Sequence, residues 1–169
     1  MIEFIKKTAP ENALQIGGSL TLTFERRQKS RQRARLDSGT EIAILLPRGS
    51  QLRDGDLLQD SQGFCIQIMA ALEPVSCARS PDLLRLARAC YHLGNRHVSI
   101  QVGPGWVRYG PDHVLDEMVR GLDLTVSREL LPFEPESGAY SGDRDGHHHY
   151  NPESDLTVAD NHSHQKTAP

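Results

Sequence analysis

The chain has 169 residues, of which 37% are hydrophobic but only 5% are aromatic, and its formal net charge is −3. This length suits one medium domain or two small ones, with a core built on leucine, isoleucine, valine and alanine. No apolar run approaches the roughly 20 residues that cross a bilayer, and the charged N-terminus lacks the apolar segment of a secretory signal. We therefore expect a cytoplasmic protein with no membrane partner.

Charge is divided unevenly along the chain. Residues 1–109 carry 15 Lys and Arg against 10 Asp and Glu, whereas residues 110–169 carry 4 against 12. The N-terminal part of the chain is thus basic, and the C-terminal part is acidic and rich in histidine. The three cysteines are odd in number, widely spaced and free of any C-x-x-C pair, which argues against a zinc ribbon or a disulfide framework. We expect them to be buried small apolar residues, namely Cys65, Cys77 and Cys90.

The first third of the chain predicts β-structure. Residues 17–27 alternate apolar and polar side chains, as a half-buried strand does. Residues 33–47 predict a strand, a turn at 37–39 and a second strand, and further turns are expected at 54–55 and 62–63. Short strands at this spacing indicate a small barrel or a pair of packed sheets.

From residue 64 the pattern changes. Residues 64–78 predict a long apolar strand with a bend near Pro74. A helix follows, with Ser80 as its cap, Pro81 at its first position and Gly94 just past its end. Positions i, i+3, i+4 and i+7 form its expected apolar face, which consists of Leu83, Leu86, Ala87 and Cys90.

The next segments complete a repeating pattern. Two strands flank the turn at residues 103–105, a second helix runs from Pro111 to Gly121, and residues 123–133 predict a last strand. The inward face of this helix is expected to hold Val114, Leu115, Met118, Val119 and Leu122. The order β-α-β-β-α-β is the ferredoxin-like split βαβ pattern. It predicts an antiparallel four-stranded sheet with both helices on one face and the other face open or used for pairing.

The fold class expected is α+β, in three parts. Residues 1–68 form a small all-β N-terminal domain, residues 69–136 form a ferredoxin-like βαββαβ domain, and residues 137–169 form a disordered, histidine-rich tail. This tail is rich in Gly, Ser, Asp and His. It holds too few large apolar groups to offset the entropy of ordering it.

The tail is the first candidate for chemistry, because it carries five of the eight histidines beside several aspartates. Neutral imidazole is the commonest protein ligand for borderline divalent metals. An expression tag or a solvated linker is the alternative, but a tag is normally one unbroken run at a terminus. Here residues 150–152 follow a triplet and a separate H-x-H comes later. We interpret these residues as metal ligands, namely His147, His148, His149, His162 and His164.

Three further histidines lie in the β-α-β-β-α-β region. His92 falls in the last turn of the first helix, where the helix dipole favours it. His97 lies just before the next strand, and a single imidazole becomes a useful anchor only if a twofold dimer doubles it. His113 begins the second helix, with Asp116 and Glu117 at i+3 and i+4. His113, Asp116 and Glu117 are thus either a metal-binding face of this helix or simply its polar face.

A basic stretch occupies residues 26–35, with six Lys and Arg in ten positions. Such a stretch contacts nucleic acid or an acidic protein. Because no aromatic residue interleaves it and no nucleic-acid motif follows, we expect no nucleic-acid partner. We interpret the stretch as a charged loop between strands that docks an acidic partner.

Enzyme signatures are missing from the sequence. It contains no G-x-x-x-x-G-K-[ST], no G-x-S-x-G and no H-E-x-x-H. A hydrolytic metalloenzyme would need an open coordination position and a nearby general base, for which Glu117 is the candidate. We expect a carrier rather than an enzyme.

Three strings resemble one family. "ACYHLGNRHVSIQV", "DHVLDEMVRGLDLTV" and "PFEPESGAY", in this order and spacing, are similar to the UreE family of urease accessory proteins, which are nickel metallochaperones. The resemblance covers roughly residues 65–140 by motif. The β-rich front and the histidine-rich end also agree with the plan of that family.

The resemblance implies a homodimer with a β-rich domain for partner or peptide binding and a ferredoxin-like metal-binding domain. It implies that His97, the histidine of G-N-R-H, pairs with its symmetry mate around a Ni²⁺ ion at the dimer interface. It also implies delivery of Ni²⁺ to the urease apoprotein, held by the other accessory proteins including the GTPase. Zn²⁺ and Cu²⁺ are expected to bind as well.

This chain departs from some relatives at Pro111, where they carry a further histidine two residues before that of D-H-V-L. An H-D-H site is therefore not expected, and His113 alone remains as a peripheral ligand. The rival hypothesis is a protein-interaction module of an assembly complex, in which the histidines buffer metal non-specifically.

Overall fold

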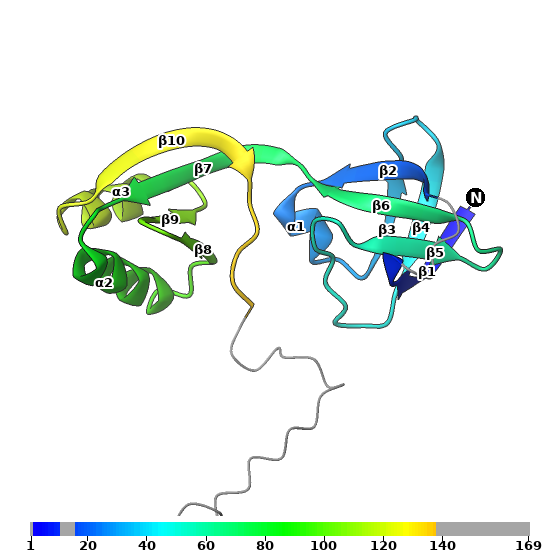
Figure 1. Cartoon of the computed structure of the whole chain (residues 1–169), viewed down its shortest axis with the longest axis horizontal. Helices are drawn as coiled ribbons and strands as arrows, with labels where there is room; N and C mark the ends of the chain where they lie inside the picture. The colour runs from blue at the N-terminus through cyan, green and yellow to red at the C-terminus, as the bar shows by residue number, and fades with distance from the viewer. Residues whose placement is uncertain (1, 11–15, 138–169) are drawn as a thin grey trace, which may run out of the picture. The chain divides into compact units, whose positions relative to one another are not determined.

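The computed structural model of this chain describes residues 2–10 and 16–137, and it contains two sheets (Figure 1). The first has six strands in the order β2-β6-β5-β1-β4-β3, which are β1 (Ile2–Thr8), β2 (Ile16–Leu22), β3 (Arg31–Arg35), β4 (Glu41–Leu45), β5 (Leu57–Asp60) and β6 (Cys65–Ala70). The second has the order β10-β7-β9-β8, formed by β7 (Leu72–Arg79), β8 (Ile100–Gly103), β9 (Trp106–Tyr109) and β10 (Thr125–Pro132). Its helices are α2 (Leu83–Gly94) and α3 (His113–Arg120), while a short helix, α1 (Phe24–Arg27), follows β2. An α+β fold with a β-rich N-terminal region is thereby confirmed.

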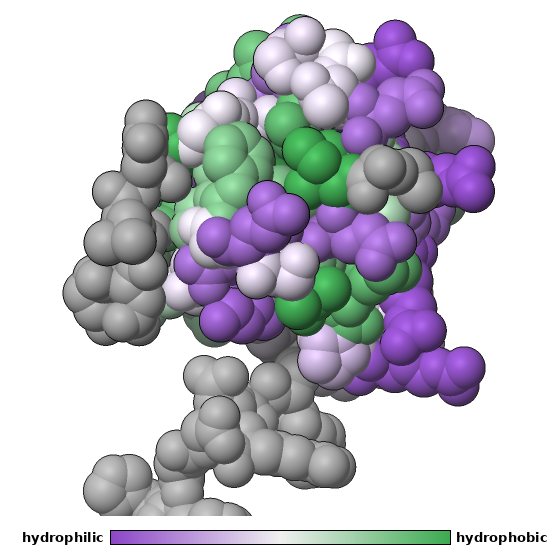
Figure 2. All heavy atoms as spheres, turned by 90° about the vertical axis from the view of Figure 1, so that its right-hand side faces the viewer, coloured by the Kyte–Doolittle hydropathy of each residue, from purple (hydrophilic) through white to green (hydrophobic). Residues whose placement is uncertain are grey.

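The six-stranded sheet has its own core, because alternate residues of its strands point inward. The buried cluster contains Leu20 and Leu22 of β2, Ile42 and Ile44 of β4, and Ile66 of β6, among other apolar side chains. The predicted turn between β3 and β4 is confirmed, with the glycine at position 39 at a φ of 93°. On the side of this region shown in Figure 2, hydrophobic residues form separate patches with hydrophilic residues between them, and hydrophilic residues line the right-hand side of the view.

The strand expected over residues 17–27 is wrong in its second half, because β2 ends at Leu22 and residues 24–27 form α1. The Phe24 N–H donates to Oε1 of Glu73 at 2.7 Å, and the Phe24 ring packs edge-on against Phe133 with centroids 5.4 Å apart. The side chain three residues later, Arg27, also turns inward. Helical spacing satisfies both side chains at once, which period-two alternation cannot do.

Arg27 also corrects the interpretation of the basic stretch, which is a helix and a strand rather than a loop. Its side chain is only 1% exposed, and burial lowers the pKa of its guanidinium. The guanidinium donates to the carbonyl of Leu22 at 3.2 Å and to that of Phe133 at 2.6 Å, and it forms an ion pair with Glu134. Arg27 is thus a structural residue and not part of a docking surface.

The predicted strand over residues 64–78 is two strands rather than one bent strand. It breaks at Ala71, whose N–H donates to the carbonyl of Leu22 at 2.9 Å. Before the break β6 pairs with β2 and β5, and after it β7 pairs with β9 and β10. Both β6 and β7 contain buried apolar residues, so the sequence stays apolar on either side of Ala71. Composition alone therefore did not reveal that the chain passes from one sheet to the other.

The β-α-β-β-α-β order from β7 to β10 is confirmed, and all three strand pairs of this sheet are antiparallel. Val107 and Tyr109 of β9 share one core cluster with Ala89 of α2 and Val119 of α3. Both helices therefore cover the same face of the sheet. Because side chains alternate along a strand, the residues of β9 that flank Val107 point to the opposite face.

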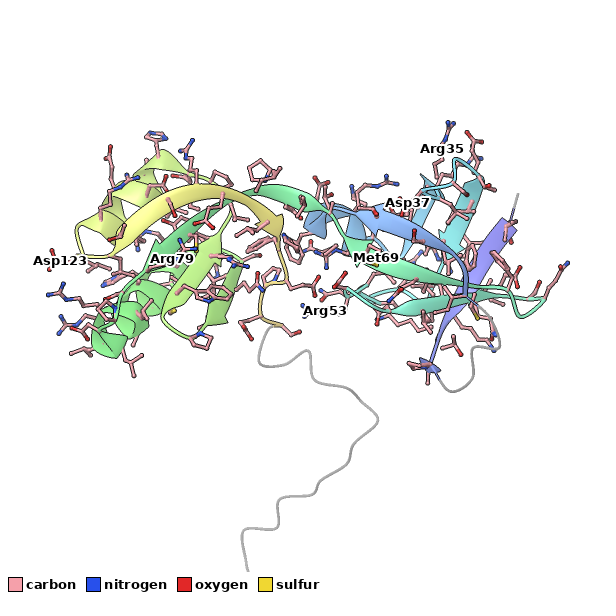
Figure 3. All side chains as sticks on the ribbon, turned by 45° about the horizontal axis from the view of Figure 1, so that its top comes forward. Arg35, Asp37, Arg53, Met69, Arg79 and Asp123 are labelled. Carbon is pink, nitrogen blue, oxygen red and sulfur yellow. The ribbon has the colours of Figure 1, made fainter. Side chains whose placement is uncertain are left out.

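That opposite face carries an ion pair and a cation–π contact. Two nitrogens of Arg79 donate to Glu129 at 2.5 and 3.1 Å (Figure 3), and this contact lowers the pKa of Glu129 to about 2. The Arg108 guanidinium lies 4.0 Å from the centroid of the Trp106 ring. A Cβ added at Gly103 would lie 2.2 Å from that ring, so the indole rests directly on the glycine backbone.

Several details of the helices differ from the expectation. The caps are Asp82 and Asp112 rather than Ser80, whose hydroxyl instead accepts from the N–H of Asp82 at 3.1 Å. Gly94 lies inside α2 instead of beyond it. Three side chains expected to face inward are exposed. Leu83 at 75% and Val114 at 59% each lie in the first turn of their helix, and Ala87 lies on the outward side of α2.

Two of the three cysteines match their predicted role. Cys65 and Cys77 are fully buried, whereas Cys90 is half-buried, and all three are free thiols. Burial raises the pKa of the Cys90 thiol. Within the described ranges, none of the helices is long and apolar enough to span a membrane.

Replacing Arg27 tests its structural role. Arg27→Ala leaves Glu134 and two carbonyls without their buried partner, so we expect the free energy of unfolding to fall by about 3 kcal/mol, as measured by urea denaturation. The control is Lys29→Ala, which removes an exposed pair with Glu25 and should cost less than about 1 kcal/mol. Equal effects of the two substitutions would contradict this role.

Candidate metal centre

The end of α2 places His97. Two backbone hydrogen bonds form the turn that follows α2. The N–H of His97 donates to the carbonyl of Gly94 at 2.9 Å, and the N–H of Val98 donates to the carbonyl of Leu93 at 3.3 Å. This pair of bonds has the pattern of the Schellman motif, with His97 at its left-handed position. Leu93 is a core residue and Val98 packs against that core, which gives the hydrophobic contact that accompanies the motif.

His97 adopts a backbone conformation that usually requires glycine. Its φ is +56°, in the left-handed region, which costs a side-chain-bearing residue about 1 kcal/mol. In the described ranges, Asp123 is the only other non-glycine residue with positive φ, at +61°. It occupies the matching turn after α3 (Figure 3), where its N–H donates to the carbonyl of Arg120 at 2.9 Å.

The His97 side chain is exposed, and it has no hydrogen-bonding partner among residues 2–10 and 16–137. Its imidazole nitrogens are therefore available to an external ligand. Strained residues that persist in a fold cluster at functional sites, and His97 combines strain with an unused ligating group. This combination marks it as the candidate anchor of a metal site.

His92 has a different environment. It lies in the last turn of α2, as predicted, and it is half-buried. Its ring packs edge-on against that of Tyr91 with centroids 5.3 Å apart. Its backbone carbonyl accepts a hydrogen bond from Nη1 of Arg96 at 2.9 Å. These contacts give His92 a packing role at the surface of α2.

His113 is exposed at the first position of α3, as is Glu117, but the predicted face is wrong at Asp116. Asp116 is buried and accepts hydrogen bonds from the hydroxyl of Tyr109 at 3.1 Å and from Nη2 of Arg128 at 3.3 Å. Burial, together with the Asp116 carboxylate, raises the pKa of Tyr109. Asp116 points inward because a buried hydroxyl needs an acceptor, so it is not available to a metal held by His113.

The last described residues run along β8, the strand that follows His97. The N–H of Glu136 donates to the carbonyl of Ile100 at 2.8 Å, and the N–H of Glu134 donates to Oε1 of Gln101 at 3.1 Å. The chain thus lies beside the beginning of β8 at Glu136. The five predicted tail ligands, His147, His148, His149, His162 and His164, lie outside the described residues.

A complete metal site is not formed within the described part of one chain. No group of three or more His, Cys, Asp or Glu in residues 2–10 and 16–137 is close enough to hold an ion. Divalent metals of the borderline class take about four or more ligands. Within the described residues, His97 and His113 are therefore separate, exposed candidate ligands, and neither belongs to a complete site.

An exposed apolar stripe lies on the helix that leads to His97. Leu84 is 59% exposed and Tyr91 is 67% exposed, and Ala87 lies between them at helical spacing. The stripe was not predicted from the sequence, where Ala87 was expected to face inward and Leu84 and Tyr91 were assigned to neither face. The signal was present, since α2 has more apolar residues than one face can bury.

Two family models match the chain, and together they cover most of it. Residues 3–71 match the N-terminal domain of UreE urease accessory protein, and residues 73–167 match its C-terminal domain. The chain is 54% identical over 142 residues to a urease accessory protein UreE from Alkalilimnicola ehrlichii, covering 84% of each chain. It is 49% identical over 148 residues to that from Pseudomonas putida strain GB-1, covering 87% of this chain and 90% of the relative. The protein of that name from Vibrio parahaemolyticus is 53% identical over 133 residues, which cover 76% of this chain and 84% of the relative.

The strain at His97 has a measurable consequence. His97→Gly removes the unfavourable left-handed side chain, so we expect the free energy of unfolding to rise by about 1 kcal/mol, as measured by chemical denaturation without metal. Asp123→Gly, at the matching position after α3, should stabilise by a similar amount. A loss of stability in His97→Gly would show that the side chain supports the fold.

Proposed function

This chain belongs to the UreE family of urease accessory proteins, and we propose that it is a homodimeric nickel metallochaperone. In this proposal it binds Ni²⁺ through His97 at the dimer interface and through tail histidines, and it delivers the ion to the urease apoprotein. The observation that supports this most is His97 itself, which is strained, exposed and without a hydrogen-bonding partner among the described residues, at the end of a helix with an exposed apolar stripe.

The stripe on α2 suggests how two chains meet. In a twofold dimer the same patch of both subunits forms the interface, so a residue near the axis lies opposite its own copy. If the patch around Leu84 and Tyr91 is that interface, the end of α2 approaches its mate. Two copies of His97 would then supply two imidazole ligands to one ion.

The tail would supply the remaining ligands. The chain leaves its described part beside β8, where Glu136 bonds to Ile100, three residues after His97. His147 follows residue 137 by ten residues, which an extended chain can span over at most about 35 Å. His148, His149, His162 and His164 lie further along. His113, on α3, would act as a peripheral ligand.

The ligand chemistry sets the conditions for binding and release. Protonated imidazole cannot bind a metal, so affinity for Ni²⁺ falls as the pH drops through the ordinary histidine range near about 6.5. Zn²⁺ and Cu²⁺ would also bind, because the divalent affinity order places Cu²⁺ above Ni²⁺. The supply of metal and the choice of partner would therefore determine which ion is delivered.

The partners follow from the family. Residues 1–68 would form the partner-binding domain, residues 69–136 the metal-binding and dimerisation domain, and residues 137–169 the tail that carries further ligands. The recipient would be the urease apoprotein in complex with the other urease accessory proteins, including the GTPase.

The role of His97 is tested with a pair of matched variants. Replacing the imidazole in His97→Gly removes two ligands per dimer, so we expect affinity at the tightest nickel site to fall at least about tenfold, as measured by titration calorimetry. Urease activation at limiting nickel should fall with it. The control Asp123→Gly makes the same backbone change after α3 and should keep both properties. Unchanged activation in His97→Gly would favour the interaction module with non-specific metal buffering.

The role of the α2 stripe is tested by introducing charge. Tyr91→Asp places two like charges near each other in a twofold interface, which costs several kcal/mol. We expect the dimer dissociation constant to rise at least about a hundredfold, as measured by sedimentation velocity. Leu130→Asp, at an exposed apolar residue of β10, is the control and should leave the dimer intact. A dimer that survives Tyr91→Asp places the interface elsewhere.

A further inference from the structure

The basic stretch forms an edge of the six-stranded sheet. β3 is the last strand in the order β2-β6-β5-β1-β4-β3, so only β4 pairs with it. Side chains alternate along β3, with Arg31, Arg33 and Arg35 exposed and Ala34 buried. Three arginines therefore lie on the outer face of an edge strand, and Figure 3 shows Arg35 at the margin of this region.

The register of β3 determines which backbone groups are free. The carbonyl of Ser30 accepts from the N–H of Leu46 at 2.9 Å, and the N–H of Leu36 donates to the carbonyl of Thr40 at 2.9 Å. Since hydrogen-bonded residues alternate along an antiparallel pair, the even-numbered residues of β3 bond to β4. The N–H and C=O groups of the three arginines at 31, 33 and 35 consequently point away from the sheet.

The arginines on this edge differ in their partners. Arg35 pairs with Glu41 at 2.9 Å. Within the described residues, no carboxylate contacts Arg26, Arg31 or Arg33. Arg26 instead donates to the outward carbonyl of Arg33 at 2.8 Å. The Arg26 guanidinium thus bonds to a backbone carbonyl of the edge, and no carboxylate among the described residues neutralises its charge.

A cavity lies at the same place. Its volume is about 280 Å³, and it is lined by Arg26, Arg33, Ala34, Arg35, Glu41 and Ile42. The cavity thus lies between the open backbone edge and two guanidinium groups without a carboxylate partner in the described residues, those of Arg26 and Arg33. An extended chain that entered it would meet hydrogen-bonding groups of the backbone and positive charge together.

We infer that β3 is a docking edge for an acidic, extended segment of a partner protein, which adds to the six-stranded sheet as a further strand. Backbone pairing would provide affinity, and carboxylates opposite Arg31 and Arg33 would provide selectivity. Such a segment would displace Arg26 from the carbonyl of Arg33 and leave its guanidinium free to pair with a carboxylate. The row of backbone donors and acceptors matches a peptide better than it matches the phosphates of a nucleic acid. This inference rests on the proposed role of residues 1–68 in partner binding.

The backbone part of the inference has a direct test. Arg33→Pro removes an N–H that points away from β4, so it spares the ladder while blocking a new strand. Arg33→Ala removes the same charge and keeps the N–H. The probe is a fluorescein-labelled short peptide that alternates glutamate and valine, and its binding to the full-length chain is followed by fluorescence anisotropy.

We expect Arg33→Pro to weaken this peptide at least about tenfold more than Arg33→Ala does. Methylation of alternate backbone nitrogens of the peptide should have a similar effect. Equal binding by the two variants, or by the methylated peptide, overturns the inference of strand addition. Circular dichroism verifies that both variants fold.

The charge part is tested with a double reversal. Arg31→Glu with Arg33→Glu should abolish binding of the glutamate peptide and permit binding of a lysine counterpart. The matched control reverses two exposed arginines on α2 and α3, Arg88→Glu with Arg120→Glu, and should bind the glutamate peptide normally. Tighter binding of duplex RNA or DNA than of the peptide overturns the inference in favour of a nucleic acid. If no probe binds the unmodified chain, the edge arginines serve only to prevent self-pairing of the sheet, and the inference fails.

Nickel titration of the same variants separates this inference from the proposed function. β3 contains none of the proposed metal ligands, so the nickel affinity of the variants should equal that of the unmodified chain. Failure of peptide binding with intact nickel binding overturns the docking edge alone, whereas failure of nickel binding in the unmodified chain overturns the metallochaperone proposal.

Discussion

The backbone turn that ends α2 determines where the imidazole of His97 can point. Two backbone hydrogen bonds and the contact of Val98 with the core hold this turn, and they force a residue with a side chain into the left-handed region. Glycine would be more stable there. The matching turn after α3 also holds a non-glycine residue, Asp123, which contacts Arg85. The same turn thus occurs twice, with the imidazole of His97 in the copy after α2 and the carboxylate of Asp123 in the copy after α3.

The surroundings of this turn bring together the elements that the proposed function needs. α2 leads into it and carries exposed apolar residues, β8 leads away from it, and residues 134–136 return along β8. Neighbouring segments of the chain thus carry the exposed His97, the exposed apolar stripe of α2 and residues 134–136. The same turn would therefore serve metal binding, dimer formation and recruitment of the tail histidines.

The order of elements from β7 to β10 could be predicted from the sequence, but the direction in which individual side chains point could not. Periodicity identified β7 to β10 with their two helices, because each element is long enough to repeat its pattern. It failed for Arg27 and Asp116, whose burial depends on partners distant in sequence, the carbonyl of Phe133 and the hydroxyl of Tyr109. It also failed for Leu83 and Val114, because a first-turn residue can share the apolar period yet extend beyond the core. The left-handed conformation of His97 has no signature in composition, and its role as an anchor stays a prediction from twofold symmetry and from the family resemblance.

The central claim is that twofold pairing makes one strained histidine into a nickel site. The most direct measurement is a crystal structure of the nickel-loaded full chain, with anomalous scattering recorded at the nickel absorption edge. The account predicts one nickel peak on the twofold axis, with an imidazole nitrogen of each His97 at about 2 Å, a typical bond length for imidazole on a divalent metal. Two His97 side chains far apart, with the nickel bound only to other histidines, would contradict it.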